Sequence, residues 1–187
     1  MIQHCEDLRL GTFEYDDEQF CLKNINGKPC LCYIGKEVFG SKIIIPKGIS
    51  SCAHMFRNTK IVTAPKIPEG VIDCTSTFES CRNLKKAHMS LPIGVKLCYA
   101  MFYDCENLEV APEIPITVTD CSYMFADCIN LKKLLTTQMS GMVTNCKFMF
   151  KNCPNLETYM NPNLSNKEEV FNMYKGCPKI LCYLLFS

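Results

Sequence analysis

A short motif recurs six times in this chain of 187 residues and constrains its fold more than any other feature. The motif pairs Met or Thr with an aromatic residue, and successive copies lie 22, 24, 23, 25 and 24 residues apart. The pairs are Met55-Phe56, Thr77-Phe78, Met101-Phe102, Met124-Phe125, Met149-Phe150 and Met173-Tyr174. A repeat of this length predicts stacked units, each of which buries its apolar face against its neighbours.

Several other positions keep the same register. A cysteine lies three residues before the Met or Thr, and another lies four residues after it, with Val170 and Thr59 as the exceptions. Three residues after the second cysteine comes a leucine or isoleucine, often preceded by asparagine. A proline recurs six residues before the first cysteine, at Pro46, Pro68, Pro92 and Pro115. This many matches in register indicates a true internal repeat.

The cysteine, methionine, phenylalanine and second cysteine occupy positions i, i+3, i+4 and i+7, which share one face of a helix. We therefore expect a two-turn helix in each repeat, with these four side chains directed into the core. Cysteine serves there as a small apolar residue. The expected core ladder comprises Cys74, Phe78, Cys81, Cys98, Met101, Phe102, Cys105, Cys121, Met124, Phe125, Cys128, Cys146, Met149, Phe150 and Cys153.

After each helix we expect a short strand, at residues 84–87, 108–111 and 131–134, followed by a turn. Stacked strands lie closer together than packed helices, so the strands would line a concave face. The predicted fold class is α/β: a curved leucine-rich-repeat solenoid of about six short helix–strand coils with a parallel concave sheet.

The expected concave face carries alternating charges. Its residues are Lys85, Lys86, Glu109, Val110, Lys132, Lys133, Glu157 and Thr158. Two interpretations are open: a solvated face whose charges neutralise one another, or a charged recognition surface, which is our candidate binding site.

The two ends depart from the repeat. We divide the chain into an N-terminal capping segment (1–44), the repeats (45–178) and a C-terminal strand or cap (179–187). Asn26-Gly27 between two apolar runs predicts a β-hairpin in the N-terminal cap. The apolar residues Leu184, Leu185 and Phe186 would either cover the last coil or associate with a partner.

The bulk composition argues against several classes of function. Twenty basic residues oppose 19 acidic ones, which is unlike a nucleic-acid-binding protein. We find no secretory signal and no membrane span. The chain is cysteine-rich, with 15 cysteines. This odd number excludes complete internal pairing, although some disulfides between adjacent coils stay open. We expect a reduced protein that is cytoplasmic or associated with a virion.

Catalytic and metal sites were weighed and are not expected. The cysteines outside the repeat are Cys5, Cys21, Cys30 and Cys32, and their spacing does not match a paired zinc motif. None of the histidines His4, His54 and His88 recurs beside a cysteine in the repeat. We therefore expect no enzyme activity, no metal and no cofactor.

The segment "VTDCSYMFADCINL" resembles the BspA-like leucine-rich repeats of bacterial surface proteins, and the Ala-Pro variants at Ala64-Pro65 and Ala111-Pro112 are similar to copies in gut bacteria and phages. The resemblance covers about residues 45–180. It implies a leucine-rich-repeat solenoid that acts in adhesion or protein binding, without catalytic residues.

The leading functional hypothesis is a non-enzymatic scaffold that mediates protein–protein binding or adhesion, with an unidentified protein or assembly as partner. The alternative is a structural component of a larger assembly, such as a phage or virus particle or a surface layer.

Overall fold

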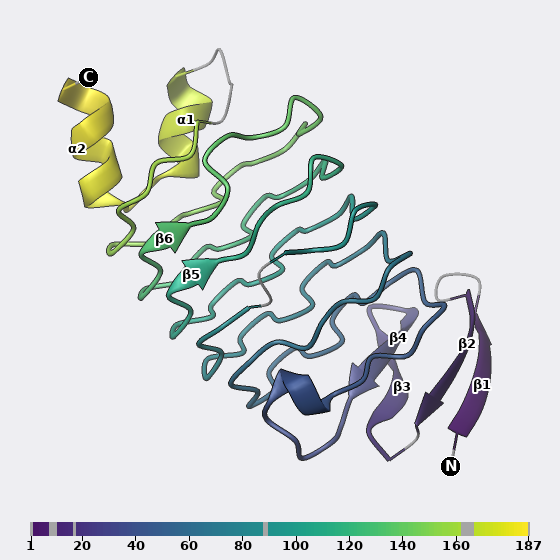
Figure 1. The fold of residues 1–187 in the computed structure, drawn as a ribbon. Coiled ribbons are helices and arrows are strands. Elements are labelled where there is room, and N and C mark those ends of the chain that lie inside the picture. Colours follow the sequence, from purple (N-terminus) through teal and green to yellow (C-terminus); the bar gives the residue numbers. More distant parts are fainter. Residues whose placement is uncertain (1, 8–10, 17, 88–89, 162–166, 187) are drawn as a thin grey trace.

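The computed structural model describes residues 2–7, 11–16, 18–87, 90–161 and 167–186. Its helices and strands are short and lie mostly near the two ends of the chain (Figure 1). They are β1 (Ile2–Asp7), β2 (Gly11–Asp16), β3 (Phe20–Ile25), β4 (Lys28–Tyr33), the 3-10 helix η1 (Gly40–Lys42), β5 (Val110–Ala111), β6 (Lys133–Leu134), α1 (Lys167–Met173) and α2 (Pro178–Phe186). Turns and irregular backbone make up most of the rest.

The predicted α/β leucine-rich-repeat solenoid, with six helix–strand coils and a parallel concave sheet, is wrong. The described residues between η1 and α1 contain no helix, and their only strands are β5 and β6, of two residues each. Each sheet in the described part of the chain has two strands, and β5 and β6 are the only strands there that pair in parallel; the other parallel pairings are isolated bridges. The first five repeats therefore lack both the helix and the long sheet of the predicted class, while α1 covers Val170 and Met173 of the sixth.

Tight turns take the place of the predicted helices because alternate backbone N–H groups bond outside their own repeat. In the fourth copy, the Met124 N–H donates to the Cys121 carbonyl oxygen (3.1 Å), three residues earlier. The Phe125 N–H instead donates to the Met149 carbonyl oxygen of the next copy (2.9 Å). An α-helix needs every interior N–H to bond four residues back, so this pattern excludes it.

Left-handed backbone angles reinforce the turns. In the first five copies, the second and sixth residues after the first cysteine have φ between 51° and 62°. These residues are His54, Asn58, Ser76, Ser80, Ala100, Asp104, Tyr123, Asp127, Phe148 and Asn152. Helical residues need φ near −63°. The spacing i, i+3, i+4, i+7 thus directs four side chains inward from consecutive turns as it would from a helix.

Aromatic rings stack through the interior, one from each copy of the motif. Neighbouring ring centroids are 5.3–5.6 Å apart, and their planes lie within 16° of parallel. The aromatic column consists of Phe56, Phe78, Phe102, Phe125, Phe150 and Tyr174, all buried. Successive copies consequently lie side by side in sequence order between the N-terminal strands and the C-terminal helices (Figure 1).

The hairpin predicted at Asn26-Gly27 is present as β3 and β4, which pair antiparallel. Both turn residues have positive φ, 54° and 79°, as a tight two-residue hairpin turn requires. The hairpin covers one end of the aromatic column, because the rings of Phe20 and Tyr33 lie 6.3 Å and 5.2 Å from the ring of Phe56.

The other end of the chain is helical. The predicted C-terminal strand is wrong, since Pro178–Phe186 forms α2. Pro178 is the first helical residue, a position where the fixed φ and missing N–H of proline are tolerated. The side chains of Leu184, Leu185 and Phe186, for which we predicted capping or association, lie outside the described residues. Neither helix in the described ranges is long and apolar enough to cross a bilayer.

Candidate functional site

The predicted contact residues come together on one side of the molecule, in two neighbouring rows. In the first row, the Lys85 N–H donates to the Val62 carbonyl oxygen (2.9 Å). The Lys132 N–H donates to the Glu109 carbonyl oxygen, and the Glu157 N–H to that of Lys132 (both 2.9 Å). These bonds hold the side chains of successive repeats next to one another.

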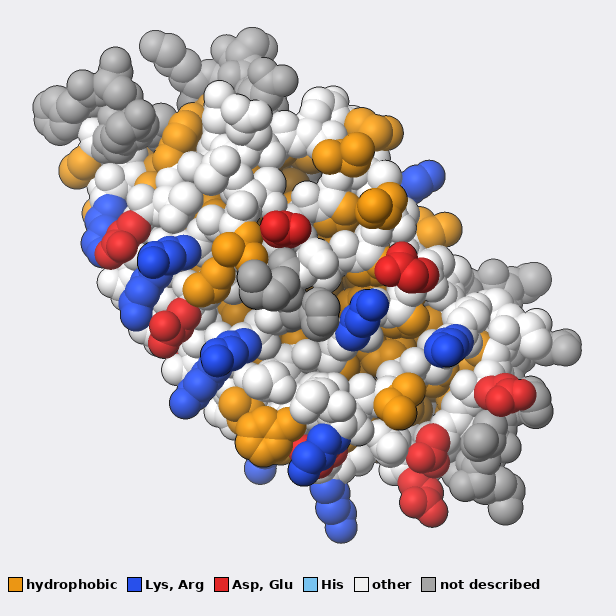
Figure 2. All heavy atoms as spheres, viewed as in Figure 1, with side chains coloured by type: hydrophobic (Ala, Val, Ile, Leu, Met, Phe, Trp, Pro, Cys, Tyr) orange, Lys and Arg blue, Asp and Glu red, His pale blue; other side chains and the backbone are white. Residues whose placement is uncertain are grey.

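The second row lies one residue further along the chain. Lys86 forms a parallel bridge with Thr63, and Val110 pairs with Lys133 between β5 and β6. We call the two rows the lysine face: Lys85, Lys86, Glu109, Val110, Lys132, Lys133, Glu157 and Thr158. Basic and acidic side chains follow one another along this face, with apolar atoms beside them (Figure 2).

Two ion pairs neutralise part of the lysine face. The Lys132 Nζ lies 3.7 Å from the Glu109 Oε2, and the Lys179 Nζ lies 2.8 Å from the Glu157 Oε1. The hydrogen bond and charge of Lys179 lower the pKa of Glu157, and Lys132 and Lys133 act in the same direction. Of the alternating charges expected from the sequence, Lys132 and Glu109 form an ion pair, whereas Glu157 pairs with Lys179, which lies outside the predicted rows.

Three lysines of the face form no close ion pair among the residues that the structure describes. Within the described residues, no carboxylate lies within ion-pair distance of Lys85, Lys86 or Lys133. The expected contact between Lys85 and Glu109 is not made, although the two occupy matching positions in adjacent repeats. The lysine face is consequently positive on balance.

A hollow lies where the backbone hydrogen bonding between repeats is interrupted. In the described part of the chain, the Glu109 N–H makes no bond to the Lys85 carbonyl oxygen, unlike the matching groups of the next two repeats. A space of about 420 Å³ lies there. Among the described residues, its lining comprises Lys85, Lys86, Ala87, Glu109, Val110, Ala111, Pro112 and Leu135. Sequence reasoning placed the charged rim but had no signal for the hollow, because it results from a local break in pairing.

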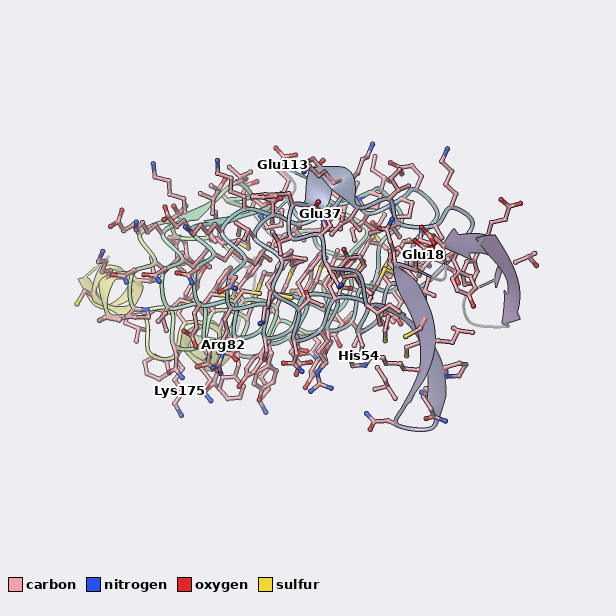
Figure 3. The ribbon with its side chains drawn as sticks, turned by 90° about the horizontal axis from the view of Figure 1, so that it is seen from below. Glu18, Glu37, His54, Arg82, Glu113 and Lys175 are labelled. Atoms are coloured by element: carbon pink, nitrogen blue, oxygen red, sulfur yellow. The ribbon has the colours of Figure 1, made fainter. Side chains whose placement is uncertain are left out.

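The cysteines of the repeat lie in the interior and not on the lysine face. The residues predicted for the core ladder are all buried. In Figure 3 the sulfur atoms lie between the side of the molecule that carries Glu113 and the side that carries Arg82. No disulfide joins the cysteines whose side chains the structure describes.

Burial makes the thiols of Cys74 and Cys81 weak nucleophiles and weak metal ligands. Desolvation raises the pKa of Cys81 to about 11 and that of Cys74 to about 12. Only the thiolate attacks an electrophile or binds a metal, so these groups are unreactive near neutral pH. No cluster of three or more His, Cys, Asp or Glu that could hold a metal ion occurs among the described residues.

The comparisons with known proteins give no match: no family model, no curated protein and no solved structure is similar to this chain. The resemblance to BspA-like repeats therefore stays a prediction from the motif.

Proposed function

We propose that this chain is a non-enzymatic scaffold that binds another protein through the lysine face. The observation that carries the proposal is the combination of a hollow with adjacent lysines that form no close ion pair among the described residues. Lys86 and Lys133 supply charge, and Val110 and Leu135, 39% and 38% exposed, supply apolar surface. Binding sites commonly combine apolar lining with a few placed polar groups in this way.

The framework behind the lysine face supports this role. Backbone hydrogen bonds between repeats fix the rows, and the stacked rings behind them fill the interior. A surface supported in this way loses little conformational freedom when a partner binds, which favours affinity.

Panning a random peptide library against the immobilised full-length chain tests the proposal. We expect enriched peptides to bind the wild type at least about tenfold more tightly than the variant Val110→Asp, because burying a carboxylate in the hollow is unfavourable. The matched control is Ile72→Asp, which changes an exposed apolar residue outside the lysine face. Peptides that bind all three proteins equally well would contradict the proposal.

A second candidate function is a structural role in a larger assembly. Three consecutive repeats expose a large apolar side chain shortly before their first cysteine: Ile93 is 80% exposed, Ile116 73% and Met142 56%. Contiguous exposed apolar side chains are typical of surfaces that become covered in a complex. Light scattering over a range of concentrations tests this role, and a monomer at every concentration would count against it.

A further inference from the structure

We propose, resting on the protein-binding role above, that the lysine face recognises an extended acidic peptide in which one apolar side chain lies between two carboxylates. The apolar side chain would occupy the hollow, and the carboxylates would pair with Lys86 and Lys133. This assigns a chemical class to the partner, which the proposed function alone does not.

The hollow accounts for the apolar side chain. Val110, Ala111, Pro112 and Leu135 provide most of its uncharged lining. A buried Leu, Ile or Phe side chain contributes roughly 1.5–3 kcal/mol when it leaves water. The volume of about 420 Å³ accommodates one such side chain and part of the peptide backbone, but not a second folded element.

The positions of the lysines account for the carboxylates. Lys133 is the direct pairing partner of Val110, while Lys86 holds the corresponding position in the preceding repeat. The paired backbones of adjacent repeats are about 4.8 Å apart. Lys86 and Lys133 are two repeats apart, so about 10 Å separates them, and somewhat more across the hollow. An extended peptide covers that distance in three to four residues.

Charge favours a peptide over a nucleic acid as the occupant. Glu109 and Glu157 lie in the row beside the two lysines, so a continuous phosphate backbone would pass close to carboxylates as well as to lysines. A peptide places carboxylates only where a lysine meets them. Such pairs at the rim of an interface contribute mainly to specificity and to the rate of association.

The test is to sequence the peptides enriched from a random library on three forms of the full-length chain. On the wild type, we expect Asp or Glu residues three or four positions apart with a Leu, Ile, Val or Phe between them. The double variant Lys86→Glu, Lys133→Glu should reverse the preference to Lys and Arg. The control Lys96→Glu, an exposed lysine outside the lysine face, should keep the wild-type preference.

Fluorescence anisotropy of a labelled enriched peptide then measures how much each variant weakens binding. We expect the double charge reversal to weaken binding of the acidic peptide by more than about tenfold, and Lys96→Glu by less than about twofold. Raising the salt concentration should weaken binding to the wild type. A merely structural role of the two lysines would not produce a reversed charge preference.

The other outcomes separate the two proposals. Enriched peptides without acidic residues that still depend on Val110 would overturn the acidic-peptide inference and leave the proposed function standing. Tight binding of a single-stranded oligonucleotide that Lys86→Glu, Lys133→Glu abolishes, with no acidic peptide enriched, would overturn the inference in favour of nucleic acid. If no peptide is enriched over an unrelated protein, both proposals fail.

Discussion

The Cys128 thiol donates a hydrogen bond to the Phe102 carbonyl oxygen of the preceding repeat, 3.1 Å away. The same bond recurs from Cys81, Cys105, Cys153 and Cys177 to the carbonyl oxygen of the phenylalanine in the preceding repeat, at 2.8–3.1 Å. In the second to sixth copies of the motif, the second cysteine therefore joins two repeats and satisfies a buried carbonyl group. This explains why a weak donor of small volume recurs at this position.

Replacing Cys128 tests that role. We expect Cys128→Ala to lower the free energy of unfolding by about 1–3 kcal/mol, because it leaves a small cavity and removes the thiol donor from the Phe102 carbonyl. Cys128→Ser should cost less, since a hydroxyl can donate to the same oxygen. Urea unfolding measures both. A serine variant less stable than the alanine variant would show that the hydrogen bond does not matter.

Removing a ring from the aromatic column should destabilise the protein more than replacing Cys128. Phe125 lies between two rings, 5.4 Å from Phe102 and 5.6 Å from Phe150. We expect Phe125→Ala to destabilise the protein by about 3–5 kcal/mol, as for other fully buried aromatic residues. The control is Phe171→Ala, because the Phe171 side chain is 52% exposed. Similar losses for the two variants in urea unfolding would contradict this account of the core.

Substitution of Asn58 distinguishes a turn from a helix, because the expected change in stability has the opposite sign in the two. Its φ is 59°, and its side chain is exposed. In a helix, Asn58→Ala would be stabilising because alanine is the better helix former. In the left-handed region, Asn58→Ala should instead destabilise by about 1 kcal/mol, while Asn58→Gly should be neutral or stabilising.

Thermal unfolding of the two Asn58 variants gives this answer directly. Lys60→Ala serves as the control for an exposed position with ordinary backbone. An increase in stability for Asn58→Ala would indicate that the segment is helical after all.

Buried thiols make the protein sensitive to alkaline pH. Burial raises the pKa of Cys81 from 9.0 to about 11 in the folded state. The stabilisation is therefore complete below pH 9 and is lost as the pH rises towards 11, because only the unfolded chain releases the proton. Each such thiol should lower the free energy of unfolding by about 1 kcal/mol at pH 10.

Urea unfolding at pH 7 and at pH 10 measures this loss. The variant Cys81→Ser, which cannot ionise in this range, should show a smaller difference between the two pH values than the wild type. Equal stability of the wild type at both values would rule out the thiols as the source of pH dependence.

The inward-facing residues could be read from the sequence, because spacing alone determines which side chains share a face. The backbone that directs them could not, since Cys121, Met124, Phe125 and Cys128 reach the interior equally well from two tight turns. One signal was available: the sixth residue after the first cysteine is Asn58, Ser80, Asp104, Asp127 or Asn152. Asparagine and aspartate tolerate positive φ better than other side chains.

The prediction of a C-terminal strand was wrong for a similar reason. An apolar run such as that after Cys177 does not separate strand from helix by its hydrophobicity. Pro178 at the start of the run was the usable sign of a helix, because proline is common at the first helical position.

The candidate site was predicted in part. The charged rows follow from the register of the repeats, so Lys85, Glu109, Lys132 and Glu157 could be expected on one face. Which charges pair could not, because Lys179, from the end of the chain, neutralises Glu157 at 2.8 Å. The hollow between Lys86 and Val110 depends on one missing backbone hydrogen bond, and no residue type in the sequence predicts that this bond is missing.

The aromatic column is closed at both ends by different means. At one end the Phe20 ring lies at 78° to that of Phe56 and presents its edge. At the other end the Tyr174 hydroxyl donates to the Met160 carbonyl oxygen at 2.8 Å and accepts from the Met160 N–H at 2.9 Å. Because the Phe20 edge covers the Phe56 ring, a further ring could join the parallel stack at this end only by displacing the β3–β4 hairpin.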